Sequence, residues 1–128
     1  MTTFLKCFAV TVLIAVAAST NAQEKRDEEL KAYYFVLLKK GPNRTQDSAT
    51  AAKIQKEHLD NINRLASIGK LNVAGPFLDD GDMRGIFIFD SGNEQEVIAL
   101  VESDPAIKAG RLSYEIHPWM TQKGICFK

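Results

Sequence analysis

The chain has 128 residues, of which 45% are apolar and 25% are charged, and its 16 Lys and Arg residues balance 16 Asp and Glu residues. This composition predicts one folded domain with one hydrophobic core and excludes intrinsic disorder. A nucleic-acid-binding protein is excluded as well, because the basic residues are scattered among acidic ones and form no stripe.

The N-terminal residues predict an export signal. Lys6 precedes an apolar stretch over residues 7–18, and Thr20-Asn21-Ala22 supplies small residues for a cleavage site. The stretch is shorter than the roughly 20 residues that a membrane-spanning helix needs. We therefore expect a signal peptide over 1–22, a charged spacer over 23–31, and a mature protein that is periplasmic or secreted, with no membrane span.

The two cysteines fall outside the expected domain, which we place at residues 32–118. Cys7 lies in the signal peptide, and Cys126 lies in a C-terminal tail over 119–128. The mature protein then has one thiol, which either stays free or pairs between chains. The tail packs either on the domain or on a partner.

The first expected strand is Ala32–Leu38, which is apolar or aromatic at every position and is followed by Lys39-Lys40-Gly41-Pro42. Because both faces of this strand are apolar, both must be covered. Helices on one side of a sheet can cover only one of them.

A long amphipathic helix follows. It begins at a cap formed by Asp47 or Ser48 and ends before Gly69. Its apolar face is marked by residues at helical spacing: Ala51, Ile54, His58, Ile62 and Leu65.

A hairpin comes next. Leu71–Ala74 is a short strand that Gly75-Pro76 is expected to end, and Gly85–Phe89 is its partner. The acidic loop between them lacks the ligand spacing of a calcium loop and is expected to be solvated.

Ser91-Gly92-Asn93-Glu94 matches a capping box and predicts a second helix that runs to about Ser103. Asp104-Pro105 stops this helix, and residues 106–110 form a turn. The last strand is Leu112–His117, whose alternation turns His117 away from the apolar face.

The order β-α-β-β-α-β with right-handed crossovers predicts a ferredoxin-like α+β fold, in which two helices cover one face of a four-stranded antiparallel sheet. The other sheet face remains apolar. We expect a second copy to pack on it, which makes a homodimer that resembles a dimeric α/β barrel.

Five short motifs occur in the order and spacing of a known family: Glu57-His58-Leu59, Gly69-Lys70-Leu71, Ala74-Gly75-Pro76, Ser103-Asp104-Pro105 and Ala109-Gly110. Over Tyr33 to Pro118 the chain resembles the YCII-related (YciI-like) family. The resemblance implies the dimeric ferredoxin-like fold and a catalytic pair formed by His58 and Asp104. Some members resemble muconolactone isomerases and dehydrochlorinases, which move protons on small enol, lactone or hydroxyquinone substrates. The sequence departs from the family at Gln55, where an arginine often precedes the histidine.

Each candidate residue also has a structural interpretation. His58 lies on the apolar face of its helix, where a histidine is either a hydrogen-bonded core residue or a general acid or base. Asp104 either orients this histidine or caps the turn before Pro105.

Four further residues are candidates for substrate binding: Tyr34, Gly75, Pro76 and Arg84. The alternatives are a strand end for the Gly-Pro pair, and packing or surface charge for the other two. No cofactor is expected, since the sequence has no phosphate-binding glycine loop. No metal site is expected, because no spacing brings His58, His117 and Asp104 together.

The sequence thus predicts a small enzyme that uses His58 and Asp104 for proton transfer on a cyclic enol, lactone or hydroxyquinone-like substrate. The alternatives are a non-catalytic module that binds a small ligand and a module for interactions in the cell envelope.

Overall fold

The computed structural model describes residues 30–125. Its strands and helices are β1 (Leu30–Lys40), α2 (Ser48–Ser67), β2 (Leu71–Pro76), β3 (Met83–Phe89), α3 (Glu94–Glu102), α4 (Pro105–Lys108) and β4 (Leu112–Gln122). The expected signal peptide, most of the spacer and Cys126 lie outside the described residues. Within residues 30–125, no helix has the length and apolar character that crossing a membrane requires.

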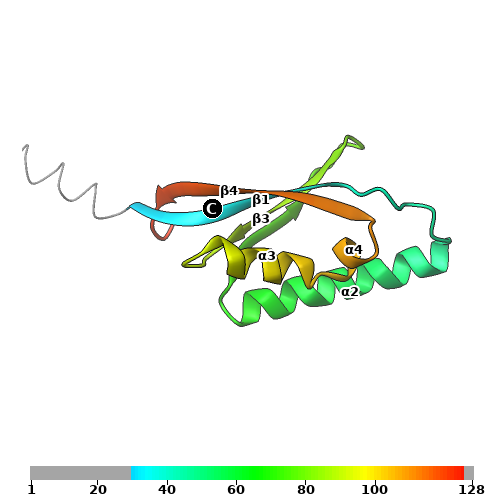
Figure 1. Ribbon diagram of the computed structural model, residues 1–128, viewed down its shortest axis with the longest axis horizontal. Helices are drawn as coiled ribbons and strands as arrows, with labels where there is room; N and C mark the ends of the chain where they lie inside the picture. Colours follow the sequence, from blue (N-terminus) through cyan, green and yellow to red (C-terminus); the bar gives the residue numbers. More distant parts are fainter. Residues whose placement is uncertain (1–29, 126–128) are drawn as a thin grey trace, which may run out of the picture. The chain divides into compact units, whose positions relative to one another are not determined.

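The strands form one antiparallel sheet in the order β2-β3-β1-β4. All three described helices lie on the same side of this sheet (Figure 1). Two crossovers, one through α2 and one through α3 and α4, produce this arrangement. The predicted ferredoxin-like α+β fold is confirmed. Ala32–Met120 form one compact unit, to which the core and the cleft described below belong.

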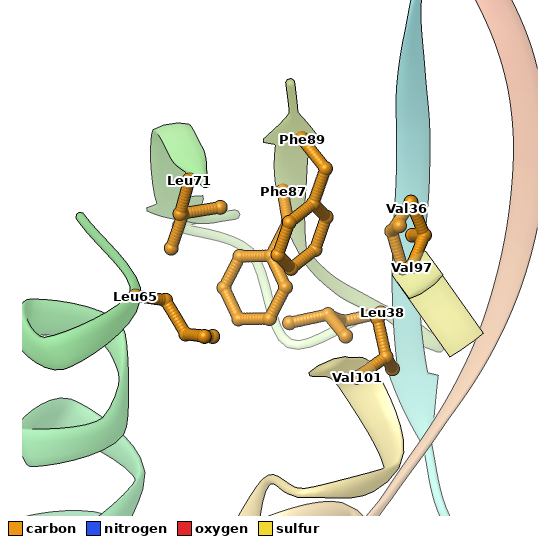
Figure 2. Packing of buried hydrophobic residues seen from close by; sticks show 8 residues of the cluster. All are labelled: Val36, Leu38, Leu65, Leu71, Phe87, Phe89, Val97 and Val101. Atoms are coloured by element: carbon orange, nitrogen blue, oxygen red, sulfur yellow. The ribbon is translucent and has the colours of Figure 1, made fainter. Parts of the chain in front are cut away.

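The core lies between the helices and the sheet. Alternate residues of the central strands point toward the helices, and residues at helical spacing point back. Figure 2 shows the packing of the eight buried core residues: Val36, Leu38, Leu65, Leu71, Phe87, Phe89, Val97 and Val101. The rings of Phe87 and Phe89 meet edge to face at a centroid distance of 5.8 Å.

Local signals fix both ends of α2. The carboxylate of Asp47 accepts a hydrogen bond from the Thr50 amide at 2.8 Å, which satisfies one of the free donors at the helix start. After the helix, Gly69 takes a φ of 74°, a left-handed conformation that favours glycine. Both ends agree with the prediction.

Gly75 and Pro76 are the last two residues of β2, so the strand ends at the predicted pair but runs two residues further than the predicted end at Ala74. Both belong to the strand, where Gly75 pairs with Ile86 and Pro76 with Gly85. The strand tolerates Pro76 because β2 is an edge strand, whose outer side has no neighbour to receive an amide bond.

Other element ends also differ from prediction. The N-cap of α3 is Asn93, which accepts from the Glu96 amide at 2.8 Å, whereas Ser91 bonds the Glu96 carboxylate. Residues after Asp104 form the short helix α4 instead of a simple turn. β1 continues through Lys40, and β4 continues past Pro118 to Gln122.

The loop between β1 and α2 and the segment between α4 and β4 are joined by backbone hydrogen bonds. The Gly41 amide donates to the Arg111 carbonyl, and the Asn43 amide donates to the Gly110 carbonyl, both at 2.9 Å. The approach is so close that a Cβ on Gly41 would lie 2.1 Å from the Gly110 oxygen. The loop over residues 41–47 is therefore held against residues 109–111.

We expect Gly41→Ala to destabilise the domain by about 2 kcal/mol or more, because the new methyl group overlaps backbone that cannot move alone. Gly92→Ala is the matched control, since a Cβ there meets nothing within 4 Å. Urea denaturation of both variants measures the effect. Equal midpoints for the two variants would mean that the two connections separate at little cost.

Candidate functional site

The imidazole of His58 meets the carboxylate of Asp104 inside the domain. Its Nδ1 atom lies 2.9 Å from both Oδ1 and Oδ2, although the residues are 46 positions apart. The exposed fractions of the two side chains are 10% and 1%. α2 carries the histidine, and the start of α4 carries the aspartate, so the contact that the sequence left open is present.

Both carboxylate oxygens of Asp104 accept hydrogen bonds. Besides His58, it accepts from Asn61 Nδ2 at 3.0 Å and from the Ala106 amide at 2.8 Å, where it caps α4. Burial alone raises the pKa of Asp104, but the hydrogen bonds from His58, Asn61 and Ala106 outweigh burial and hold its pKa below the ordinary value. The carboxylate is therefore ionised at neutral pH, and both roles expected for Asp104 are present together.

The ionised carboxylate sets the tautomer of neutral His58. A carboxylate can only accept, so Nδ1 carries the proton and Nε2 carries the lone pair. Within residues 30–125, Nε2 has no hydrogen-bond partner, yet no buried side-chain nitrogen or oxygen lacks one. Nε2 is therefore not sealed in the core, and it is available to a molecule beside His58.

His58 borders a cleft with a volume of about 320 Å³. The cleft lies within the Ala32–Met120 unit, and its lining is formed by Leu38, Arg44, Ile54, Gln55, His58, Leu59, Ile62, Ala74, Gly75, Pro76, Arg84, Gly85, Phe87, Ala106, Arg111 and Leu112. The imidazole stacks on Phe87 at a centroid distance of 6.0 Å and an interplanar angle of 26°. Small-molecule sites usually enclose about 300–1,000 Å³, so the cleft has the size for one small substituted ring.

Residues 32–120 match the family model of the YCII-related domain. The chain belongs to the YCII-related family. Among solved structures, it is similar to the 5-chloro-2-hydroxyhydroquinone dehydrochlorinase of Burkholderia phenoliruptrix AC1100 in complex with 2,5-dihydroxybenzoquinone. The identity is 26% and the TM-score 0.53, over 68% of this chain and 92% of that chain. A search of the curated proteins finds no match.

The YCII-related domain brings most of the predicted site residues together. Gly75, Pro76 and Arg84 line the same cleft as His58, while Asp104 lies behind the imidazole. Tyr34 is the exception. It packs against the hydrophobic core and is not part of the lining formed by the described residues.

Asn61 of the YCII-related domain was not among the predicted site residues. This buried side chain donates to Asp104 Oδ2 and accepts from Arg64 Nη2 at 2.8 Å, whereas the Ala106 amide donates to Oδ1. A signal was present: Asn61 follows His58 by three positions and therefore shares the apolar face of α2. A polar residue at such a position needs a buried partner.

Arg44 and Arg111 were missed as well, and both line the cleft. They lie in connections with no regular pattern, and the backbone bonds between residues 41–47 and 109–111 bring them together. Gln55 also lines the cleft.

Among residues 30–125 of the YCII-related domain, no three His, Cys, Asp or Glu side chains gather as a metal site. His117 is exposed on β4, as predicted, with Nε2 at 3.9 Å from a Glu115 carboxylate oxygen. It lies outside the lining of the His58 cleft.

Proposed function

We propose that the protein is a small enzyme of the YCII type that transfers a proton on a small cyclic enol, lactone or hydroxyquinone-like substrate. His58 is the general base and acid, and Asp104 is the residue that positions it. The observation that carries the proposal is the bond of Nδ1 to a buried, ionised carboxylate, which leaves Nε2 available at the cleft.

The chemistry follows from this arrangement. Nε2 accepts a proton from an acidic C–H or O–H group of the bound ring, and the imidazolium that forms is stabilised by the carboxylate of Asp104. Returning the proton to another atom of the same ring completes an isomerisation, and no external reactant is needed. Histidine suits this role because its ordinary pKa lies near neutral pH.

The similar solved structure supports the choice of substrate class. That protein is a dehydrochlorinase of a chlorinated hydroxyhydroquinone, and its structure contains a dihydroxybenzoquinone. A planar oxygenated ring of this kind fits a cleft of about 320 Å³, since a cavity of about 150 Å³ already holds a benzene molecule.

The direct experiment is solvent exchange. The protein is incubated in D2O with dihydroxybenzoquinone or with an unsaturated butenolide, and NMR follows the loss of ring C–H signals. Exchange faster than in buffer supports the enzyme. Binding without exchange for every compound would favour the alternative of a non-catalytic ligand-binding module.

We also propose that the protein is exported. This proposal rests on the pattern of residues 1–22 alone, and determining the N-terminal residue of the mature protein tests it.

We further propose that the protein works as a homodimer. This proposal rests on the sheet face opposite the helices, where Phe35, Leu37, Ile86 and Ile88 alternate with the core residues of β1 and β3. Such an apolar face is typical of an interface between copies.

We expect Leu37→Glu to convert the dimer to a monomer, because a carboxylate in the centre of an apolar interface loses its hydration without gaining a partner. Ala52→Glu is the control, since Ala52 is exposed on α2. Light scattering coupled to gel filtration measures the mass. A wild-type mass equal to that of one chain would contradict the dimer directly.

A further inference from the structure

The cleft beside His58 has an unbalanced set of charges. Among the residues that the structure describes, its lining includes Arg44, Arg84 and Arg111 but no Asp or Glu. Asp104 is the nearby acid, and it is already committed to His58, Asn61 and the Ala106 amide. As far as residues 30–125 form it, the lining therefore has three positively charged residues and no negatively charged one.

The three arginines are not equivalent. Arg84 Nη1 lies 3.2 Å from a carboxylate oxygen of Asp80, so its charge is partly balanced. Arg44 Nη1 donates to the Arg111 carbonyl at 2.6 Å, and Arg111 Nη1 donates to Gln46 Oε1 at 2.8 Å. Within the part of the chain that the structure describes, neither Arg44 nor Arg111 forms an ion pair.

Both guanidinium groups are held in place before any ligand arrives. The backbone bonds of Gly41 and Asn43 to residues 110 and 111 fix the two connections against each other. Gln46 strengthens this junction, because its amide donates to the Ala109 carbonyl while its oxygen accepts from Arg111. A guanidinium has five N–H donors, of which these bonds use one in each arginine, so donors remain for a ligand.

We infer that Arg44 and Arg111 form an anion-binding subsite, and that the substrate is a small ring with a carboxylate, enolate or phenolate oxygen that binds there. This inference rests on the proposed function for the role of His58, which takes the proton from the same ring.

The subsite also has a role during the reaction. When Nε2 removes a proton from a neutral enol, negative charge develops on the ring oxygen. Preorganised donors aimed at such an oxygen stabilise the charge without moving. Arg44 and Arg111 therefore act on the charged form of the ring more strongly than on its neutral form.

The test compares two probes that share the same ring and differ in charge. Dimedone is a cyclic diketone that is an enolate at neutral pH, and its methyl enol ether carries no charge. We expect calorimetry on the wild-type protein to show tighter binding of the enolate. Arg111→Gln and Arg44→Gln should each weaken enolate binding about tenfold or more and leave ether binding unchanged. Raising the salt concentration to about 1 M should weaken the binding of the enolate and leave the binding of the ether unchanged.

Two controls separate charge from structure. Lys53→Gln removes one positive charge from an exposed part of α2 that does not line the cleft, and should change neither affinity. Gln46→Ala removes the bond that holds Arg111 but keeps both guanidinium charges, and should preserve most of the preference for the enolate. Arg111→Lys should restore part of the affinity that Arg111→Gln loses.

The outcomes show separately whether the anion-binding subsite fails and whether the proposed catalysis fails. Equal affinity for enolate and ether in the wild type, or an equal loss in Gln46→Ala and Arg111→Gln, overturns the anion subsite while leaving His58-dependent exchange intact. Arginine-dependent enolate binding with no solvent exchange on any ring supports the subsite and overturns the proposed catalysis.

Discussion

Replacing His58 by Gln is expected to slow enzyme-dependent solvent exchange by about 10²–10⁴-fold, the usual contribution of a general acid or base. Glutamine keeps a side-chain amide that can donate to Asp104, so the buried carboxylate retains a partner. It has no group that accepts a proton near neutral pH. The exchange rate in D2O and the affinity for the enolate are measured on the same sample.

Asp104→Asn tests whether Asp104 sets the tautomer of His58. Asparagine can still cap α4, but its amide can donate to Nδ1 of His58, which then holds the proton on Nε2 instead. We expect exchange to fall at least about a hundredfold, because the imidazole presents the wrong tautomer. If either variant exchanges solvent as fast as the wild type, the pair has a purely structural role.

Asp104→Ala is expected to destabilise the domain by about 3 kcal/mol or more. The substitution leaves His58 Nδ1, Asn61 Nδ2 and the Ala106 amide without their buried acceptor, and each such group costs about 1–3 kcal/mol. Domain stabilities are about 5–15 kcal/mol, so the loss is a large fraction of the total. The free energy of unfolding in urea measures it.

Asp47→Ala is the matched control for this variant, because Asp47 caps α2 in the same way but is exposed. Its loss should be clearly smaller than that of Asp104→Ala. Equal losses would mean that capping alone explains the contribution of Asp104, and that the bonds to His58 and Asn61 add nothing to stability.

The same carboxylate gives the stability a pH dependence. Because the hydrogen bonds lower the pKa of Asp104 in the folded state, its contribution is present above the unfolded pKa of about 3.9 and is lost as the pH falls through the folded value. The difference in free energy of unfolding between wild type and Asp104→Asn should therefore be largest near neutral pH and shrink below about pH 4.

Local signals in the sequence were sufficient for most of the fold. Asp47 and Gly69 mark the ends of α2, and they do so through bonds within the helix and its caps. The end of β2 was predicted two residues early, because whether Gly75 and Pro76 can pair with β3 depends on the edge position of β2, and that position is a property of the whole sheet.

The residues of the candidate site also differ in how far the sequence predicts them. His58 and Asp104 were named through the family resemblance, whereas their own sequence pattern left a core histidine and a turn cap as alternatives. Arg44 and Arg111 were not found, because the loops that carry them are held together by the contact between Gly41 and Gly110, which no sequence periodicity predicts. Tyr34 was proposed for its chemistry, yet it packs against the core.

The double duty of Asp104 has a consequence for comparing relatives. One oxygen of its carboxylate, Oδ1, both starts α4 and holds the imidazole. In a relative without the proposed reaction, an aspartate at position 104 would still stabilise the start of α4, whereas position 58 would no longer need a polar group and a leucine there could extend the core beside Phe87. Across the family, the identity of the residue at position 58 should therefore separate active from inactive proteins, and an aspartate at position 104 should not.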